Sequence, residues 1–164
     1  MKKTILAAVL FLGVGFIACR NAPNSNPKKE KVHKTANQTK TNMKNLASII
    51  EIPVTDLPRA IAFYQTILGL NIEKMEMDGV QMGVFPSGEE TVNVVLAKGS
   101  DYRPTADGAV VYLNAGNNLQ PALDKIEQNG GKIIVPKTGI SPEMGYFALF
   151  IDTEGNKLGL HSKN

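Results

Sequence analysis

The stretch that decides the fold is residues 48–70, which read SIIEIPVTDLPRAIAFYQTILGL. The first seven residues are mostly apolar and β-branched, a composition typical of a strand. Asp56 is a residue type that caps helices, and Pro58 stands in the first turn, where a missing N–H group costs nothing. Apolar side chains then recur at helical spacing up to Gly69, so the stretch predicts one strand followed by one helix.

Three further strands are predicted after this helix. They cover residues 71–77, 80–85 and 91–97. The first two flank Asp78-Gly79, which is a strong signal for a tight hairpin turn. The first half of the domain therefore has the element order β-α-β-β-β.

The second half of the domain repeats this order. Residues 109–113 are predicted to form a strand, and residues 119–126 carry an apolar helical stripe that ends before Gly130-Gly131. Three more strands are predicted at 132–135, 146–151 and 157–161. Two βαβββ modules, about 47–98 and 109–162, thus make one domain over residues 47–164. Because each module alone leaves a sheet face unburied, we expect an α+β fold whose modules pair into an open, curled, mixed β-sheet around a shared concavity.

The N-terminal residues have the composition of a targeting segment. Lys2 and Lys3 precede fifteen uncharged residues, a run that is short for a membrane span and typical of a signal peptide over residues 1–18. Phe16-Ile17-Ala18-Cys19 resembles a bacterial lipobox, in which the cysteine is lipidated after cleavage. Cys19 is the only cysteine of the chain. The alternative is an ordinary signal peptide or anchor helix with an incidental cysteine.

Residues 19–46 contain no aromatic side chain and are rich in Asn, Lys, Pro and Thr, which predicts a flexible basic tether. Seven basic residues and one glutamate give it a net charge of +6, whereas nine basic and fourteen acidic residues give 47–164 a net charge of −5. An acidic domain repels a phosphate backbone, so nucleic acid is excluded as a partner. We expect a protein of the bacterial cell envelope, periplasmic or associated with the outer membrane, held to lipid through Cys19.

Two motifs carry a family resemblance. The run IPVTDLPRAIAFY over residues 52–64, with Leu68-Gly69-Leu70 after it, resembles the opening of vicinal oxygen chelate superfamily proteins. Asp152-Thr153-Glu154-Gly155-Asn156 resembles the turn before the last strand of that family. The superfamily includes glyoxalase I, bleomycin-resistance proteins, fosfomycin-resistance enzymes and extradiol dioxygenases. The resemblance therefore implies the glyoxalase-like fold and leaves the chemistry open.

The resemblance also implies where a metal ion would bind. Family enzymes take ligands from the first and last strands of each module. These positions fall on Ile49, near Val110, on Gly159 and within residues 92–96, where Asn93 is the only polar residue. Ile, Val and Gly side chains bind no divalent cation, which needs imidazole, carboxylate or thiolate. We therefore expect no metal-ligating residues and no cofactor.

Strand alternation indicates a different candidate site. Side chains two residues apart on a strand share a face. Glu51 therefore lies on the same inner face as Ile49, Tyr112 on that of Val110, and His161 on that of Gly159. We expect these three side chains to meet in the concavity, one step along from the family's metal site. Three roles stay open: a buried Glu–His hydrogen bond that only rigidifies the domain, ligand recognition or acid–base catalysis, and a relocated metal site.

The sequence thus predicts a membrane-anchored, glyoxalase-like protein that binds a small molecule in the sheet cavity without the usual metal site. Whether it is an enzyme is left open. One alternative is a metal-dependent lyase or isomerase, of the lactoylglutathione lyase kind, or a dioxygenase with displaced ligands. The others are a metal-free binding protein of the drug-resistance type and a structural domain whose own side chains fill the cavity. The expected partners are an unidentified small molecule and the membrane, and a homodimer is left open.

Overall fold

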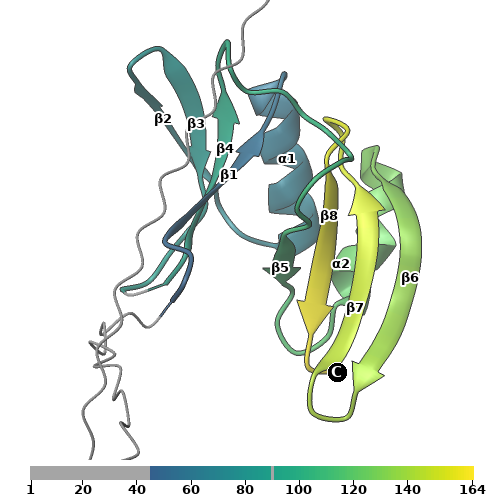
Figure 1. The fold of residues 1–164 in the computed structure, drawn as a ribbon. Coiled ribbons are helices and arrows are strands. Elements are labelled where there is room, and N and C mark those ends of the chain that lie inside the picture. The colour runs from purple at the N-terminus through teal and green to yellow at the C-terminus, as the bar shows by residue number, and fades with distance from the viewer. Residues whose placement is uncertain (1–44, 90) are drawn as a thin grey trace, which may run out of the picture. The chain divides into compact units, whose positions relative to one another are not determined.

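Two βαβββ modules follow one another along the chain, in the order that the sequence predicts (Figure 1). The computed structural model describes residues 45–89 and 91–164. The first module comprises β1 (Ile49–Pro53), α1 (Leu57–Leu68), β2 (Glu73–Met77), β3 (Val80–Val84) and β4 (Asn93–Lys98). The second comprises β5 (Tyr112–Asn114), α2 (Gln120–Ile126), the 3-10 turn η1 (Glu127–Asn129), β6 (Lys132–Ser141), β7 (Gly145–Ile151) and β8 (Lys157–Ser162).

The N-terminal predictions fall outside the described residues. These are the signal peptide over 1–18, the lipidation site Cys19 and the tether as far as residue 44. Within the part of the chain that the structure describes, no helix is long and apolar enough to cross a membrane.

Each module builds a four-stranded mixed sheet of its own, with the order β1-β4-β3-β2 in the first and β5-β8-β7-β6 in the second. In both sheets the first and last strands of the module pair in parallel, and the other neighbours are antiparallel. The repeated topology confirms the predicted α+β fold of two βαβββ modules.

Local sequence signals set the ends of α1. The side chain of Asp56 accepts a hydrogen bond from the backbone N–H of Arg59 at 3.0 Å, and a proline lies in the first turn. Gly69 ends the helix with a φ of +67°, in the left-handed region that glycine adopts without a steric penalty.

The boundaries of two strands, β5 and β6, differ from the prediction by more than two residues. β6 runs for ten residues to Ser141 instead of ending at 135, although Pro136 and Gly139 disfavour a continuous strand. Shifts in register along its pairing with β7 accommodate both residues at irregularities. β5 comprises only Tyr112–Asn114, because those are the residues that pair with β8.

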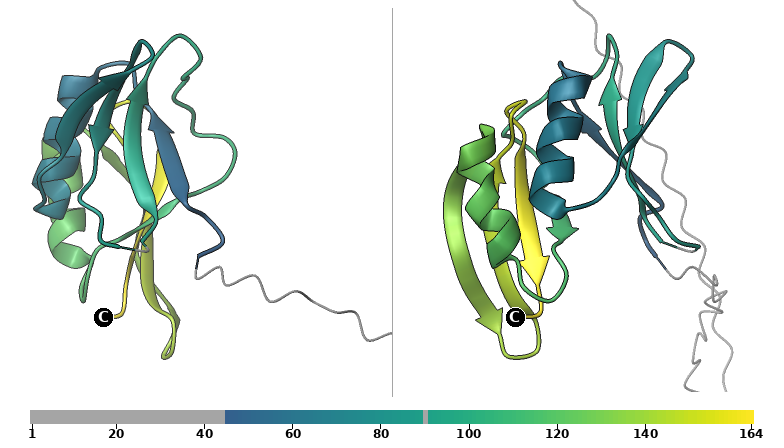
Figure 2. Two further views of the ribbon diagram at one scale, coloured as in Figure 1. Left: turned by 90° about the vertical axis from the view of Figure 1, so that its left-hand side faces the viewer. Right: turned by 180° about the vertical axis from the view of Figure 1, so that it is seen from behind.

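One hydrophobic core joins the modules. It contains apolar side chains of α1 and α2 and of the sheet faces that pack against them. The rings of Phe63 on α1 and Phe150 on β7 lie 6.2 Å apart between centroids, and α1 contacts α2. Figures 1 and 2 show α1 between the two sheets.

The position of this core determines the direction of the sheet face that does not pack against a helix. Because alternate residues of a strand point to opposite faces, the residues that do not face the helices form an open face on each sheet. Since both helix-covered faces converge on one core, the two open faces turn outward. These two faces therefore do not meet across the core, although residues of both modules, among them Glu51 and Lys157, line a small hollow of about 100 Å³.

The turn over residues 152–156 fastens the second module to the first. Glu154 Oε2 accepts hydrogen bonds from the Thr55 N–H at 2.9 Å, the Thr55 hydroxyl at 2.8 Å and the Asp56 N–H at 3.0 Å. Glu154 Oε1 accepts one from Arg59 Nε at 2.8 Å. Burial raises the pKa of Glu154, but the hydrogen bonds from Arg59, Asp56 and Thr55 outweigh burial and lower the pKa from 4.5 to about 2.

A buried hydrogen bond reinforces this junction. The Tyr64 hydroxyl donates to Asp152 Oδ2 at 2.6 Å, and Asp152 Oδ1 accepts from the Asn156 N–H at 2.8 Å. Asn156 in turn donates through Nδ2 to the carbonyl oxygen of Pro53 at 2.8 Å. Burial, together with the neighbouring Asp152 carboxylate, raises the pKa of Tyr64 well above 10, so the phenol stays a donor. The motif that resembles the family turn thus holds the two modules together.

Candidate functional site

The open face of the second sheet carries a pocket of about 390 Å³. Its volume lies in the range of pockets that hold small ligands. The pocket is lined by β5, the residues just after β5 and the end of β8: Tyr112, Asn114, Gly116, His161, Ser162 and Lys163.

The ring of Tyr112 forms one wall of this pocket and lies directly over Gly159. A Cβ atom on Gly159 would stand 2.2 Å from Tyr112 Cδ1 and 2.5 Å from Cε1, far inside the contact distance of two carbon atoms. The ring also packs edge-on against Phe147, at 6.2 Å between centroids. Tyr112 remains 48% exposed. Tyr112 therefore occupies space that only a glycine at position 159 leaves free.

The strand registers show which residues pair at the positions where we expected the family's metal ligands. In the second sheet Tyr112 stands opposite Gly159. In the first sheet Ile49 stands opposite Asn93. Isoleucine, asparagine, tyrosine and glycine offer no imidazole, carboxylate or thiolate. Within residues 45–89 and 91–164, no group of three or more His, Cys, Asp or Glu side chains could hold a metal ion. The side chains at these expected positions therefore lack the groups that usually bind a divalent cation.

His161 lies beside Tyr112 on the same open face, as strand alternation predicts. Its Nε2 stands 2.7 Å from the carbonyl oxygen of Met144. Because a carbonyl only accepts, the hydrogen must be on Nε2, and the bond fixes the orientation of the imidazole. The structure therefore brings Tyr112 and His161 together in one pocket.

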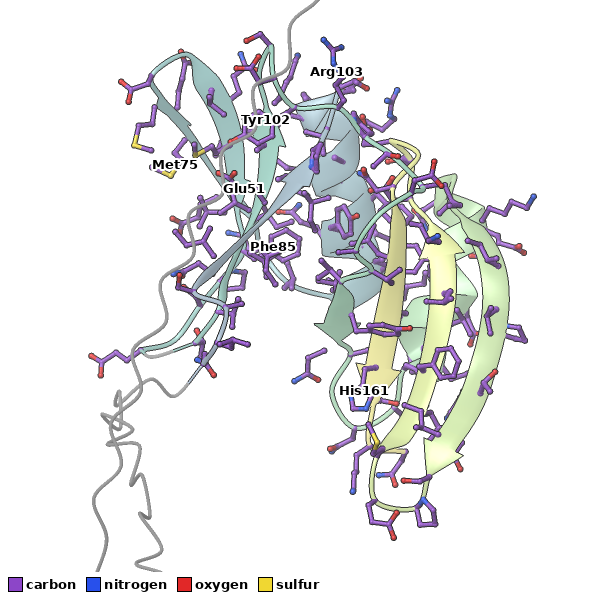
Figure 3. All side chains as sticks on the ribbon, in the orientation of Figure 1. Glu51, Met75, Phe85, Tyr102, Arg103 and His161 are labelled. Atoms are coloured by element: carbon purple, nitrogen blue, oxygen red, sulfur yellow. The ribbon has the colours of Figure 1, made fainter. Side chains whose placement is uncertain are left out.

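Glu51 lies on the first sheet and takes no part in that pocket. Its Oε2 accepts a hydrogen bond at 2.9 Å from the hydroxyl of Tyr102, in the connection between the modules (Figure 3). This hydrogen bond raises the pKa of Tyr102. Glu51 and His161 thus have separate partners, and the Glu–His hydrogen bond that we considered does not form. Glu51 instead lines a separate hollow of about 100 Å³ together with Val111 and Lys157 of the second module.

Three residues around these groups were not among our predictions. Asn114 lies two residues after Tyr112, and Lys163 lies two residues after His161, so each shares the face of the residue before it. Extending the alternation by one step along each strand would have identified both. Tyr102 gives no such signal, because it lies in an irregular connection between the modules.

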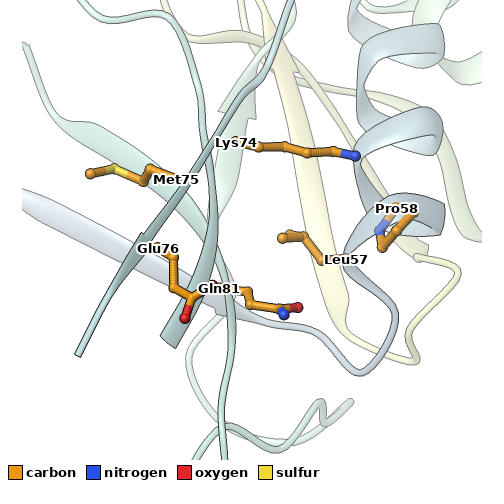
Figure 4. A pocket seen from close by; sticks show the side chains of 6 residues that line it. All are labelled: Leu57, Pro58, Lys74, Met75, Glu76 and Gln81. Carbon is orange, nitrogen blue, oxygen red and sulfur yellow. The ribbon is translucent and has the colours of Figure 1, made fainter. Parts of the chain in front are cut away.

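A second hollow lies where β2 and β3 approach the start of α1 (Figure 4). It measures about 340 Å³ and has both a cation and a carboxylate in its wall. Its lining residues are Leu57, Pro58, Lys74, Met75, Glu76 and Gln81. This mixture of charges gives no preference for a charged ligand.

Comparison with known proteins agrees with this architecture. A family model described as Glyoxalase/Bleomycin resistance protein/Dioxygenase superfamily matches residues 46–160. A glyoxylase-like domain-containing protein of Didymella fabae is 29% identical over 117 residues, which are 65% of this chain and 85% of that protein.

Solved structures show the same fold. A mutant of glyoxalase I from Zea mays superimposes with a TM-score of 0.56 at 20% identity, over 71% of this chain and 46% of that chain. This chain thus spans less than half the length of the maize protein. A glyoxalase/bleomycin resistance protein from Albidiferax ferrireducens T118 gives a TM-score of 0.55 at 19% identity, over 73% of this chain and 100% of that chain. Since the family model covers most of the chain, the protein belongs to the Glyoxalase/Bleomycin resistance protein/Dioxygenase superfamily.

Proposed function

We propose that the domain binds a small molecule in the pocket of Tyr112 and His161, without a metal ion. The observation that carries this proposal is the ring of Tyr112 over Gly159, which fills space at a position where family enzymes present a metal ligand. Glyoxalase chemistry relies on a metal ion that polarises the carbonyl groups of the substrate. The side chains of this pocket offer no set of ligands for such an ion. We therefore assign the pocket a binding role and derive no catalytic step.

The decisive experiment measures thermal unfolding of the purified chain with added ligands. Zn²⁺, Ni²⁺ and Mn²⁺ should leave the melting temperature unchanged. A metal that binds the native state tightly adds about 2.7 kcal/mol at a hundredfold excess over its dissociation constant, which a melting curve resolves. A library of small organic molecules should contain stabilising ligands whose effect disappears in Tyr112→Ala.

Two outcomes would overturn this proposal. One metal ion bound per chain and lost in His161→Ala would restore the metal-dependent lyase, isomerase or dioxygenase. If no ligand depends on Tyr112, the domain is structural and its pocket has no binding role. The matched control is Tyr146→Ala, an exposed tyrosine of β7 on the same sheet that does not line the pocket.

We also propose that lipid on Cys19 anchors the domain to a membrane of the bacterial cell envelope. The support is the resemblance of residues 16–19 to a lipobox and the position of the only cysteine at the end of an uncharged run. Radiolabelled fatty acid should enter the wild-type chain in its native host and not Cys19→Ser. Equal labelling of both chains would refute the anchor and leave the pocket proposal standing.

A further inference from the structure

We propose that the pocket of Tyr112 and His161 takes a small organic anion, an aromatic carboxylate. This inference rests on the proposed function and names the class of ligand. It is carried by the hydrogen-bonding groups of the lining, by their charge and by the exposed ring of Tyr112.

Asn114 offers the pocket a donor. Its Oδ1 accepts a hydrogen bond at 2.9 Å from the backbone N–H of Gly116. That bond fixes which end of the amide is oxygen and leaves the amino group, which has two donors and no acceptor, as the unengaged end. A carboxylate satisfies such a group, whereas a ligand cation does not.

The basic residues of the lining add charge to these donors. Lys163 donates one of its three ammonium hydrogens to the carbonyl oxygen of Glu143, which holds the ammonium near the pocket and leaves two hydrogens for a ligand. The imidazole of His161 is held by its bond to Met144 and gains a second donor when it is protonated. The hydroxyl of Ser162 already donates its hydrogen to a main-chain oxygen of Asn164 at 2.5 Å.

The charge of the lining distinguishes this pocket from three other hollows among the described residues. None of the six described residues that line it carries a carboxylate. Three other hollows each include a carboxylate. The hollow of Figure 4 includes Glu76, one beside Phe85 includes Glu73, and one beside Lys157 includes Glu51 and Asp107. The side chains that line this pocket therefore offer an ammonium group to an anion and no carboxylate, and charge-assisted hydrogen bonds are stronger than neutral ones.

The ring of Tyr112 favours an aromatic partner for that anion. Gly159 covers one side of the ring, and the residue is 48% exposed. Phe147 already packs edge-on against it, so the ring is held in place and forms a rigid surface. Aromatic rings stack on such a surface or meet it edge-on, which adds to the gain from burial alone.

The test compares benzoate with benzamide, which has the same ring and nearly the same size but no charge. Binding is measured by titration calorimetry of the purified chain at low ionic strength. We expect benzoate to bind at least about tenfold more tightly than benzamide, a factor equivalent to about 1.4 kcal/mol. Added salt should weaken the binding of benzoate and leave that of benzamide unchanged.

Two variants separate charge from shape. Asn114→Asp keeps the oxygen that accepts from Gly116, so the local fold is retained, and places a carboxylate in the pocket. It should weaken benzoate by about tenfold or more and leave benzamide within about twofold. Lys163→Gln should weaken benzoate as well. Its matched control is Lys132→Gln, an exposed lysine on β6 of the same sheet outside the pocket, which should change nothing.

The outcomes distinguish this inference from the proposed function. Equal affinity for both probes, lost in Tyr112→Ala, would overturn the choice of an anion and leave the binding pocket standing. Unchanged benzoate affinity in Asn114→Asp would also overturn it. If neither probe binds, the inference is wrong. The proposed function is refuted as well only if the ligand library also contains no stabilising molecule whose effect is lost in Tyr112→Ala.

Discussion

Replacing Glu154 by glutamine tests the contact that fastens the two modules together. The carboxylate accepts four hydrogen bonds from Thr55, Asp56 and Arg59, and its side chain is 0% exposed. Glutamine keeps the size of the side chain but removes the negative charge and turns an amino group toward donors. We therefore expect Glu154→Gln to fold and to be less stable than the wild type.

The pKa of Glu154 sets the size of this effect. A folded-state pKa of about 2 against an ordinary value of 4.5 corresponds to about 3 kcal/mol, at about 1.4 kcal/mol for each pH unit. The Arg59 guanidinium is 49% exposed, so water screens part of its attraction. The free energy of unfolding at neutral pH should therefore fall by about 2 kcal/mol.

The same pKa predicts how the difference depends on pH. Because the pKa is lower in the folded state than in the unfolded chain, the stabilisation is complete above pH 4.5 and is lost as the pH falls through about 2. The wild type should lose the stabilisation from the Glu154 carboxylate between pH 4.5 and about 2. Glu154→Gln lacks this carboxylate, so its stability should not change for this reason. The two unfolding free energies should therefore approach one another as the solution is acidified.

Urea titrations followed by circular dichroism, repeated from neutral pH down to about pH 2.5, measure both quantities. Glu76→Gln is the matched control, because Glu76 lies on the exposed strand β2 and should change stability by less than about 0.5 kcal/mol. A difference between Glu154→Gln and wild type that is no larger than this control, or that does not shrink on acidification, would refute the reasoning.

Three further substitutions test other contacts. Tyr64→Phe removes a buried hydroxyl that donates to a carboxylate, so the free energy of unfolding should fall by about 1–3 kcal/mol in urea; an unchanged value would mean that this bond contributes nothing. Gly159→Ala places a methyl group against the ring of Tyr112, so stability should fall by about 1–3 kcal/mol, and an unaltered melting curve would contradict the close approach. Tyr102→Phe removes an exposed hydrogen bond and should change stability by less than about 0.5 kcal/mol; a larger loss in the same titration would show that its hydroxyl is not exposed in solution.

The sequence by itself determined the features that depend on neighbouring residues. The cap at Asp56 and the stop at Gly69 define α1, and both act within a few residues of the helix ends. The order of strands and helices and its repetition follow from local periodicity, which gives the duplicated α+β fold. Alternation along one strand also determined that His161 shares the face of its strand with Gly159.

Only the tertiary structure decided which of these faces meet. Alternation assigns Glu51 to a face of its own sheet and His161 to a face of another, but it carries no information on the direction in which each sheet turns. That direction is fixed by contacts between residues far apart in the chain, such as Phe63 with Phe150 and Thr55 with Glu154. Burying both helices in one core turns the two open faces outward, so Tyr112 and His161 share a pocket and Glu51 does not.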